Sequence, residues 1–281
     1  MSSTSPSFLS PKTLAQAIGV SESSVKRWAD DGRIRIQKTS GGHRRIPVAE
    51  AARFVREQGI VLVEPERLGL VIPPEIERAE DPIEAALRRG AGMELQNLLA
   101  TRYLAGEPLA ALFDGPVSTA LRHIGEIWRQ DTRGIFLEHR ASAAARDALI
   151  ALSRLIPTPR AGAPTAVGGA IAGDTSQLPS MMVSMVLANE GLRTVDLGPD
   201  SPAIALVHAA EAESARLVWV SVNHMPDESI GRAEMRELAA GLGERKLVIG
   251  GATASRLKVA PSTMRIQSMA ELAAFGAGIA S

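Results

Sequence analysis

Hydroxyl and cationic side chains in the first 58 residues have the types and spacing of a nucleic-acid contact surface. One group shares a single segment with helical spacing and comprises Ser23, Ser24, Lys26 and Arg27. The other group flanks a glycine-rich turn and comprises Lys38, His43, Arg44 and Arg45. Phosphate contacts from the second group would give salt-dependent affinity, whereas the first group could reach base edges. Together they predict binding to double-stranded DNA.

Small polar residues and glycines follow the apolar segments of the C-terminal half. They are Asp174, Ser176, Ser221, Gly250 and Gly251. If the apolar segments are parallel strands, their carboxyl ends meet at the edge of the sheet where such folds bind ligands. Glycine has no side chain, so it lets the backbone lie close to a bound molecule. The pattern predicts a small-molecule site at this edge.

Two short helices would position the first group. Ser10 can cap a helix whose first position is Pro11 and which ends at Gly19. Ser21 can cap a second helix that runs to Asp30. The apolar side chains expected between the helices are Leu14, Ile18, Val25 and Trp28. Two short helices about a tight glycine turn predict a helix-turn-helix, whose second helix would enter the major groove.

A basic hairpin and a third helix complete this module. Residues 33–38 alternate as a half-buried strand does, residues 39–42 predict a turn, and residues 43–47 return as a second strand. Residues 48–58 have the apolar spacing of a helix. This order resembles the winged-helix head of MerR-type regulators and phage excisionases. The resemblance implies sequence-specific binding at a promoter or operator, and a head of this size implies a homo-oligomer, dimer or tetramer, on a two-part site.

The charge distribution separates this head from the rest of the chain. Up to Glu57 the chain has ten Lys and Arg against five Asp and Glu, although the whole chain balances 31 against 31. A basic head on a mildly acidic body favours a nucleic-acid-binding module with a regulatory or assembly body. The chain has no Cys, which excludes disulfides and thiolate metal sites. Because it shows no signal-peptide pattern and no apolar run of membrane-spanning length, we expect a soluble, cytoplasmic protein with no membrane partner.

The middle of the chain predicts a linker followed by a helical bundle. Prolines interrupt residues 59–75, and apolar stripes at helical spacing continue to about residue 160. Asp81-Pro82 predicts a helix start, residues 106–108 predict an interruption, and Gly115-Pro116 predicts another helix start. We therefore expect four helices packed as a bundle.

Three residues of this bundle have a distinctive spacing. They are Trp128, Glu138 and His139. From the residues alone, Trp128 would fill the core and the Glu-His pair would be an exposed helix start, where the helix dipole favours Glu138. The spacing also resembles the helical cap of the cobalamin-binding photoreceptor repressors of the CarH/LitR type. That resemblance implies that the three side chains lie over the upper face of adenosylcobalamin.

The C-terminal segment alternates apolar strands with helices of roughly a dozen residues. Strands are expected at 166–172, 193–197, 217–222 and 246–249, with helices at 178–189, 201–213 and 229–242 and shorter elements afterwards. This alternation predicts a doubly wound parallel sheet. We therefore divide the chain into a DNA-binding head (1–58), a linker (59–75), a four-helix bundle (76–160) and a Rossmann-like domain (161–281), a multidomain α and α/β protein.

The loops of the predicted sheet resemble those of the cobalamin-binding Rossmann-like domain, with departures. Asp174 matches the first loop, and Ser221 and the Gly250-Gly251 pair fall at the family's distances. Ser176 stands where the family has its cobalt-binding His, and Pro179 stands where it has a Gly. A hydroxyl is a poor cobalt ligand beside imidazole, so no protein metal ligand is predicted.

A second family histidine is also missing, because Arg129 follows Trp128. His224 ends a neighbouring strand and could substitute, although a loop histidine of structural role is the simpler interpretation. Three interpretations of the pocket stay open. It could hold cobalamin without a His ligand, another tetrapyrrole or a nucleotide as a small-molecule effector, or nothing, with the fold serving only for oligomerisation.

The whole pattern predicts a transcriptional regulator, and by resemblance a repressor of the light- or cobalamin-responsive type that controls carotenoid genes. The alternative is a corrinoid-dependent methyl carrier or an enzyme accessory protein, which shares the bundle and the Rossmann-like part. A methyl carrier or an enzyme accessory protein would have no evident need for the basic head. No catalytic arrangement of sufficient specificity stands out in the sequence, so we expect no enzyme activity.

Overall fold

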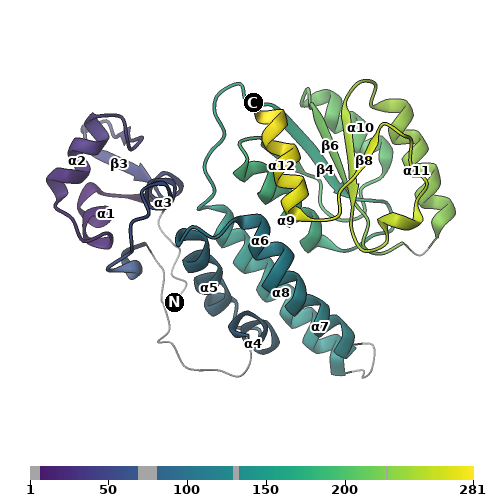
Figure 1. Ribbon diagram of the computed structural model, residues 1–281, viewed down its shortest axis with the longest axis horizontal. Coiled ribbons are helices and arrows are strands. Elements are labelled where there is room, and N and C mark those ends of the chain that lie inside the picture. The colour runs from purple at the N-terminus through teal and green to yellow at the C-terminus, as the bar shows by residue number, and fades with distance from the viewer. Residues whose placement is uncertain (1–6, 69–80, 129–132, 226) are drawn as a thin grey trace. The chain divides into compact units, whose positions relative to one another are not determined.

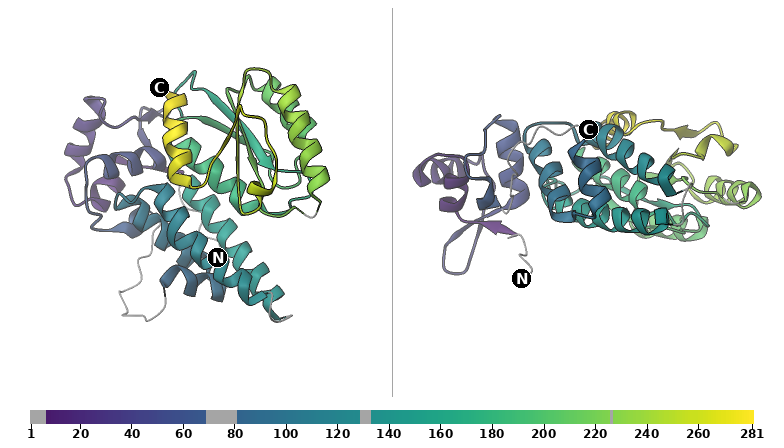
Figure 2. Two further views of the ribbon diagram at one scale, coloured as in Figure 1. Left: turned by 45° about the vertical axis from the view of Figure 1, so that its right-hand side comes forward. Right: turned by 90° about the horizontal axis from the view of Figure 1, so that it is seen from below.

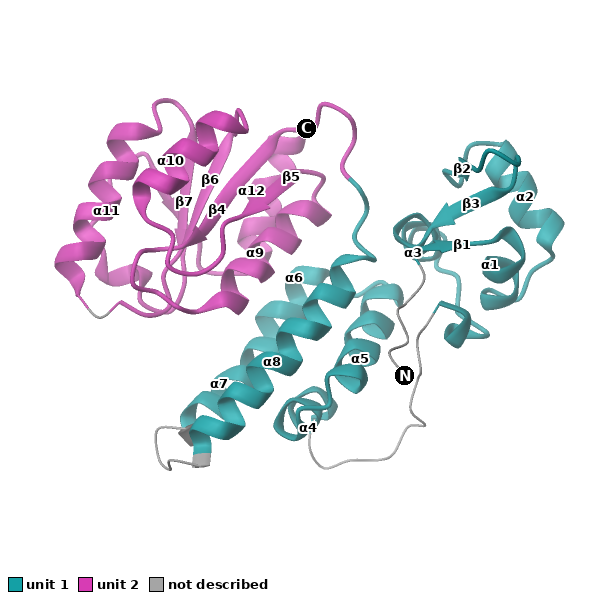
Figure 3. Cartoon of the chain, turned by 180° about the vertical axis from the view of Figure 1, so that it is seen from behind, with its two compact units in different colours: residues 1–158 teal, residues 159–281 magenta. Residues whose placement is uncertain are grey.

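The computed structural model describes residues 7–68, 81–128, 133–225 and 227–281. The chain forms two compact units, residues 1–158 and residues 159–281, coloured teal and magenta in Figure 3. Within the described residues, no helix combines the length and the apolar character needed to cross a membrane.

The head has a helix-turn-helix followed by a small hairpin and a third helix. Its elements are β1 (Phe8–Leu9), α1 (Pro11–Ala17), α2 (Glu22–Asp30), β2 (Gln37–Lys38), β3 (Arg44–Pro47) and α3 (Val48–Glu57), and the 3-10 turn Pro65–Leu68 follows. The predicted caps are confirmed, because the Ser10 and Ser21 hydroxyls accept from the amides of Thr13 and Ser24. Gly19 adopts the left-handed backbone that ends the first helix.

The predicted strand at 33–38 is only partly correct. Its first residues are not paired in a sheet, because their amides have other acceptors. The amides of Arg33 and Ile34 both donate to the carbonyl of Trp28, and the amide of Arg35 donates to Glu50. Only β2 pairs with β3, while β1, which the sequence did not predict, pairs with the other edge of β3.

The bundle forms around one long helix. Its elements are α4 (Pro82–Arg89), α5 (Gly92–Leu104), α6 (Leu109–Leu112), the π-helical segment Phe113–Val117, α7 (Ser118–Trp128) and α8 (Arg133–Ser153). Helices α4, α5 and α7 all pack on α8, as the predicted bundle requires (Figure 3). The predicted start at Asp81-Pro82 is confirmed, because the Asp81 carboxylate accepts from the amides of Ile83 and Glu84.

The predicted helix start at Gly115-Pro116 is wrong. Both residues lie inside a helical stretch that is continuous from Leu109 to Trp128. Proline removes one amide donor from a helix interior, and a π-helical turn is a form in which the helix accommodates such a change in its hydrogen bonds. The sequence rule failed because it treats Gly-Pro as a boundary.

The second unit has the doubly wound parallel sheet that the sequence predicts. Its elements are β4 (Thr165–Ala170), α9 (Gln177–Asn189), β5 (Arg193–Asp196), α10 (Ala203–Ala212), β6 (Leu217–Ser221), α11 (Glu228–Gly241), β7 (Lys246–Gly250), the 3-10 turn Ala254–Arg256, β8 (Thr263–Arg265) and α12 (Met269–Ala280). The strand order is β5-β4-β6-β7-β8, and every pair is parallel. The last helix is longer than the short elements expected after the fourth strand.

Helices cover both faces of this sheet. Helices α9 and α12 lie on one face and α10 and α11 lie on the other (Figures 1 and 2). Strands β4 and β6 are buried along their whole length, which explains their nearly continuous apolar sequence. The chain order reverses between β4 and β6, so the loops after these strands meet at the edge where ligands of open α/β sheets bind.

Candidate functional sites: a cationic groove and a sheet edge

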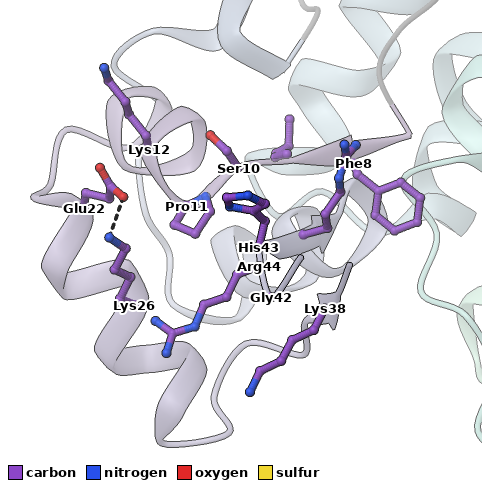
Figure 4. A pocket seen from close by; sticks show the side chains of 12 residues that line it. Phe8, Ser10, Pro11, Lys12, Glu22, Lys26, Lys38, Gly42, His43 and Arg44 are labelled. Carbon is purple, nitrogen blue, oxygen red and sulfur yellow. Dashed lines mark ion pairs between the residues drawn. The ribbon is translucent and has the colours of Figure 1, made fainter. Parts of the chain in front are cut away.

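The head contains a groove of about 680 Å³ between its helices and its hairpin. The residues that line it are Phe8, Leu9, Ser10, Pro11, Lys12, Glu22, Lys26, Lys38, Gly42, His43, Arg44 and Arg45. Figure 4 shows side chains from α1, α2 and the hairpin around this groove. Helix α2 and the hairpin therefore contribute to one surface, as DNA binding by a winged helix-turn-helix requires.

Five of the eight predicted DNA-contact residues line this groove, namely Lys26, Lys38, His43, Arg44 and Arg45. Ser23 and Ser24 do not line it, and their hydroxyls hydrogen-bond to the Ser21 cap at 2.8 and 2.9 Å. Arg27 is exposed on α2. Lys12 is a groove residue that the sequence interpretation missed, although its position directly after the Ser10-Pro11 cap could have pointed to it.

Two cations of the groove are already paired with carboxylates. Arg44 Nη2 lies 2.7 Å from Asp30 Oδ1, which joins the hairpin to the end of α2. Lys26 Nζ lies 2.8 Å from Glu22 Oε1 across one helical turn. The Lys26 hydrogen bond lowers the pKa of Glu22, so this carboxyl stays ionised. The cations available to phosphate without breaking an ion pair of the described residues are Lys12, Lys38 and Arg45.

A buried carboxylate fixes the hairpin relative to α3. Glu50 is 8% exposed, accepts from the Arg35 amide at 2.8 Å and pairs with Arg53. Burial alone would raise the pKa of Glu50, but the Arg53 and Arg35 hydrogen bonds outweigh it and hold the pKa below its usual value. The segment that leads into the hairpin is thereby held by a charged hydrogen-bond network.

At the sheet edge, Asp174 is fully buried and its carboxylate accepts only from backbone amides. Oδ1 accepts from Ser176 at 2.9 Å, and Oδ2 accepts from Asn223 at 2.6 Å and from His224 at 3.1 Å. These donors belong to the loops after β4 and β6. Asp174 therefore joins two loops of the edge, and none of its described contacts is with an imidazole.

Two more side chains extend this network. The Asp200 carboxylate accepts from the Gly173 amide at 2.7 Å, and Asp200 has a left-handed backbone with φ 50°. Asn223 donates to Ser221 Oγ at 2.8 Å and accepts from the Ala252 amide at 3.2 Å. The loops after β4, β5, β6 and β7 are thus tied together by side chains. Ser221 is 3% exposed, so it does not offer its hydroxyl to solvent.

At several glycines in and beside the sheet, other protein atoms occupy the space where a side chain would lie. A Cβ on Gly168 would lie 2.1 Å from the Trp219 ring, and a Cβ on Gly169 would lie 2.7 Å from Ser201 Oγ. A Cβ on Gly251, whose φ is +114°, would lie 2.5 Å from the Val222 carbonyl oxygen. These glycines are needed for packing within the domain, whether or not a ligand binds.

The Trp219 indole, 1% exposed, is also held by hydrogen bonds. Its Nε1 donates to Ser180 Oγ at 3.1 Å, and Ser180 Oγ donates to Asp196 Oδ1 at 2.7 Å. Burial raises the pKa of Asp196 above its usual value, which the Ser180 and Gly198 hydrogen bonds only partly offset. This chain of contacts fixes the ring of Trp219, which belongs to β6, against α9.

The predicted cap residues are on the bundle. His139 is 76% exposed at its side chain, and its Nε2 lies 3.5 Å from Glu138 Oε2. Glu138 also accepts from the Ser142 hydroxyl at 2.8 Å. Trp128 is the last residue of α7, and its side chain lies outside the described part of the chain, as does Arg129. The Glu138-His139 pair is accessible at the first turns of α8.

The loop after β4 does not fit a corrinoid whose cobalt is held by a protein imidazole from the position of Ser176. Ser176 has no imidazole, Asp174 is satisfied by three amides, and Trp219 and Ser201 occupy the space at Gly168 and Gly169. Among the described residues, no three His, Asp or Glu side chains are grouped as a metal site.

Residues 8–59 match the family model of a helix-turn-helix domain. No curated protein is significantly similar to the chain in sequence. Among solved structures, the monomethylamine corrinoid protein of Methanosarcina barkeri is 18% identical with a TM-score of 0.56, and the match covers 71% of this chain and 97% of that chain. This likeness shows a shared fold.

Two further solved structures match with lower TM-scores. The methanol:cobalamin methyltransferase complex of Methanosarcina barkeri is 19% identical over 71% of this chain and 80% of that chain, with a TM-score of 0.36. A cobalamin-binding protein from Desulfitobacterium hafniense is 17% identical over 69% and 94%, with a TM-score of 0.34. The chain thus joins an N-terminal helix-turn-helix domain to a fold that it shares with a corrinoid protein.

Proposed function

We propose that the chain is a sequence-specific DNA-binding transcriptional regulator of the MerR type. The observation that carries this proposal is the cationic groove between α2 and the hairpin, in a segment that matches a helix-turn-helix domain. Lys12, Lys38 and Arg45 supply phosphate contacts, while α2 supplies the side chains that face the bases. The Asp30–Arg44 ion pair holds the two parts of this surface together.

The proposal includes repression and oligomerisation. The resemblance to MerR-type and CarH-type regulators supports a homo-oligomer that occupies a promoter and blocks transcription. A head with three short helices contacts only a short stretch of DNA, and two heads on adjacent half-sites give the affinity that one head lacks. Light scattering of the full chain gives the oligomer size, and a reporter gene behind a selected site gives the sign of regulation.

The decisive experiment is retention of genomic fragments by the full-length protein in 0.15 M salt with excess competitor DNA. We expect a small set of fragments to be enriched, and their mobility shift to weaken as salt rises. Equal retention of all fragments would contradict sequence-specific binding. No retention at low salt would contradict DNA binding altogether.

A corrinoid-responsive regulator is the second candidate, and it is supported by the resemblance of Trp128, Glu138 and His139 to the CarH-type cap and by the fold shared with a corrinoid protein. Because Ser176 stands where the family has its cobalt-binding His, any corrinoid would be held without a protein ligand from this position. The same absence disfavours the methyl-carrier alternative, and we propose no enzyme activity. The absorption spectrum of the purified chain after incubation with adenosylcobalamin, in the dark and after illumination, distinguishes these cases. A colourless protein that still shifts DNA would contradict the corrinoid-responsive candidate.

A further inference from the structure

The groove of the head contains one carboxylate among the described residues that line it, and that carboxylate is Glu22. Every other charged lining residue is a cation or a histidine. A carboxylate repels the phosphates of DNA, so on a surface that bound phosphate alone Glu22 would lower affinity. Its presence therefore points to a role other than phosphate binding.

Helix stability does not supply that role. Glu22 and Lys26 form an exposed pair, with side chains 41% and 48% exposed, and such i, i+4 pairs stabilise a helix only slightly. The first turn of α2 already has the Ser21 cap, whose hydroxyl accepts from the Ser24 amide. The helix dipole also favours Glu22 in the first turn, but at an exposed position this adds only a small stabilisation, so the helix can form without it.

The position of the pair points to the bases instead. Glu22 is the first residue of α2 and Lys26 lies one turn later, and the first residues of a recognition helix are the ones that reach base edges. Figure 4 shows the two side chains meeting at one side of the groove. Glu22 Oε1 and Lys26 Nζ are 2.8 Å apart.

A C·G base pair has the complementary pattern in the major groove. Cytosine presents an amino donor beside the O6 and N7 acceptors of guanine. The cytosine amino nitrogen and guanine O6 are joined by the pairing hydrogen bond, so they lie about 2.9 Å apart. An acceptor and a donor on the protein, 2.8 Å apart, match this edge in spacing and in kind.

We propose that the Glu22–Lys26 ion pair reads one C·G base pair, with Glu22 accepting from the cytosine amino group and Lys26 donating to guanine. This assignment rests on the proposed DNA-binding function and names the sequence that one part of the groove recognises. Replacing C·G by T·A places the O4 acceptor of thymine against the carboxylate and the amino group of adenine against the ammonium group. Both contacts then become repulsive.

The test begins with selection of bound duplexes from a random-sequence pool by the full-length protein. Fluorescence anisotropy then compares the best duplex with duplexes in which each C·G pair is changed to T·A. We expect one position at which this change weakens wild-type binding roughly 5- to 150-fold. Glu22→Gln is expected to lose this discrimination and to shift the preference toward adenine, because Gln pairs with adenine N6 and N7.

Lys26→Met is the second variant and is expected to lose the discrimination at the same position. Asp31→Asn is the matched control, because it removes one exposed carboxylate at the end of α2 that does not line the groove. It should keep the preference. An unchanged unfolding temperature shows that each variant is folded. If Glu22→Gln is not folded, Lys26→Met still tests whether the ion pair reads the C·G pair.

Two outcomes separate this inference from the proposed function. If both groove variants retain the wild-type C·G preference, the base-reading role of the pair is wrong while DNA binding stands. If the selection enriches no sequence at all, the proposed function itself fails. If Asp31→Asn loses the C·G preference to the same extent, the assignment is also wrong, because net charge alone would then explain the loss.

Discussion

The cationic groove of the head and the polar edge of the sheet use similar residue types in opposite ways. In the head, Lys12, Lys38 and Arg45 line an open groove without an ion pair in the described part of the chain. At the sheet edge, Asp174 and Asn223 are satisfied by amides and a hydroxyl of neighbouring loops. Cations gathered in one open groove are available to phosphate, whereas the closed hydrogen-bond network of the edge holds its loops in place.

The largest predicted effect concerns the packing of the sheet. Gly168→Ala places a methyl group against the buried Trp219 ring, and overpacking of this kind costs about 3 kcal/mol of unfolding free energy. Urea unfolding followed by circular dichroism measures this cost. Gly278→Ala, where no atom beyond the adjoining residues and backbone of its own helix lies within 4 Å of the added Cβ, is the control and should leave stability unchanged or slightly higher. Equal stability of the two variants would contradict the packing described for Trp219.

The open groove is best tested with Lys38→Ala combined with Arg45→Ala. Loss of two phosphate contacts should weaken DNA binding about tenfold or more and reduce the salt slope of log K by about two. Mobility-shift titrations at several salt concentrations give both values. Arg232→Ala, on α11 of the second unit, removes a partly exposed cation far along the chain and should change neither. An unchanged salt slope in the double variant would exclude the hairpin from the interface.

Asp174→Asn tests whether the sheet edge depends on its carboxylate. The amide nitrogen of Asn cannot accept from the backbone donors that face it, so at least one buried amide loses its acceptor. We expect a loss of about 2 kcal/mol in unfolding free energy with DNA affinity unchanged. Differential scanning calorimetry and a mobility shift of the same sample give the two results. Wild-type stability would show that the loops are held in another way.

The smallest predicted effect concerns the stability of the head at acidic pH. Because the folded-state pKa of Glu50 lies below its unfolded value, its ion pair with Arg53 contributes stability above the unfolded pKa. That contribution decreases as the pH falls toward the folded pKa. Wild-type stability should therefore decline more steeply than that of Glu50→Gln below about pH 4.5. Parallel pH profiles of unfolding by circular dichroism would contradict this account of Glu50.

Local sequence signals predicted most of the fold. The caps at Ser10, Ser21 and Asp81, the turn before β3, and the alternation of strands and helices after residue 161 each depend on neighbours within a few positions. The short strand β1 was missed because its pairing with β3 joins residues nearly forty positions apart. Local patterns in a single sequence do not show which distant residues pair.

The candidate sites were less predictable for the same reason. The partner of Arg44 lies 14 positions away, and two of the three amide partners of Asp174 lie about 50 positions away, so composition could not show these contacts. The Glu22–Lys26 pair, in contrast, has the i, i+4 spacing of a helix and was readable from the sequence. The sequence interpretation assigned Lys26 to DNA and left its neighbour out.

The buried indole of Trp219 makes the second unit optically distinct from the head. Trp28 is half-buried beside Phe54, with ring centroids 5.0 Å apart, and lies under the Arg33 guanidinium. A ring in a dry interior emits at shorter wavelength than one near solvent, so denaturation of each unit carries its own spectral signature. In a chain with Trp128→Phe, intrinsic fluorescence would report whether the head and the sheet melt together or one after the other.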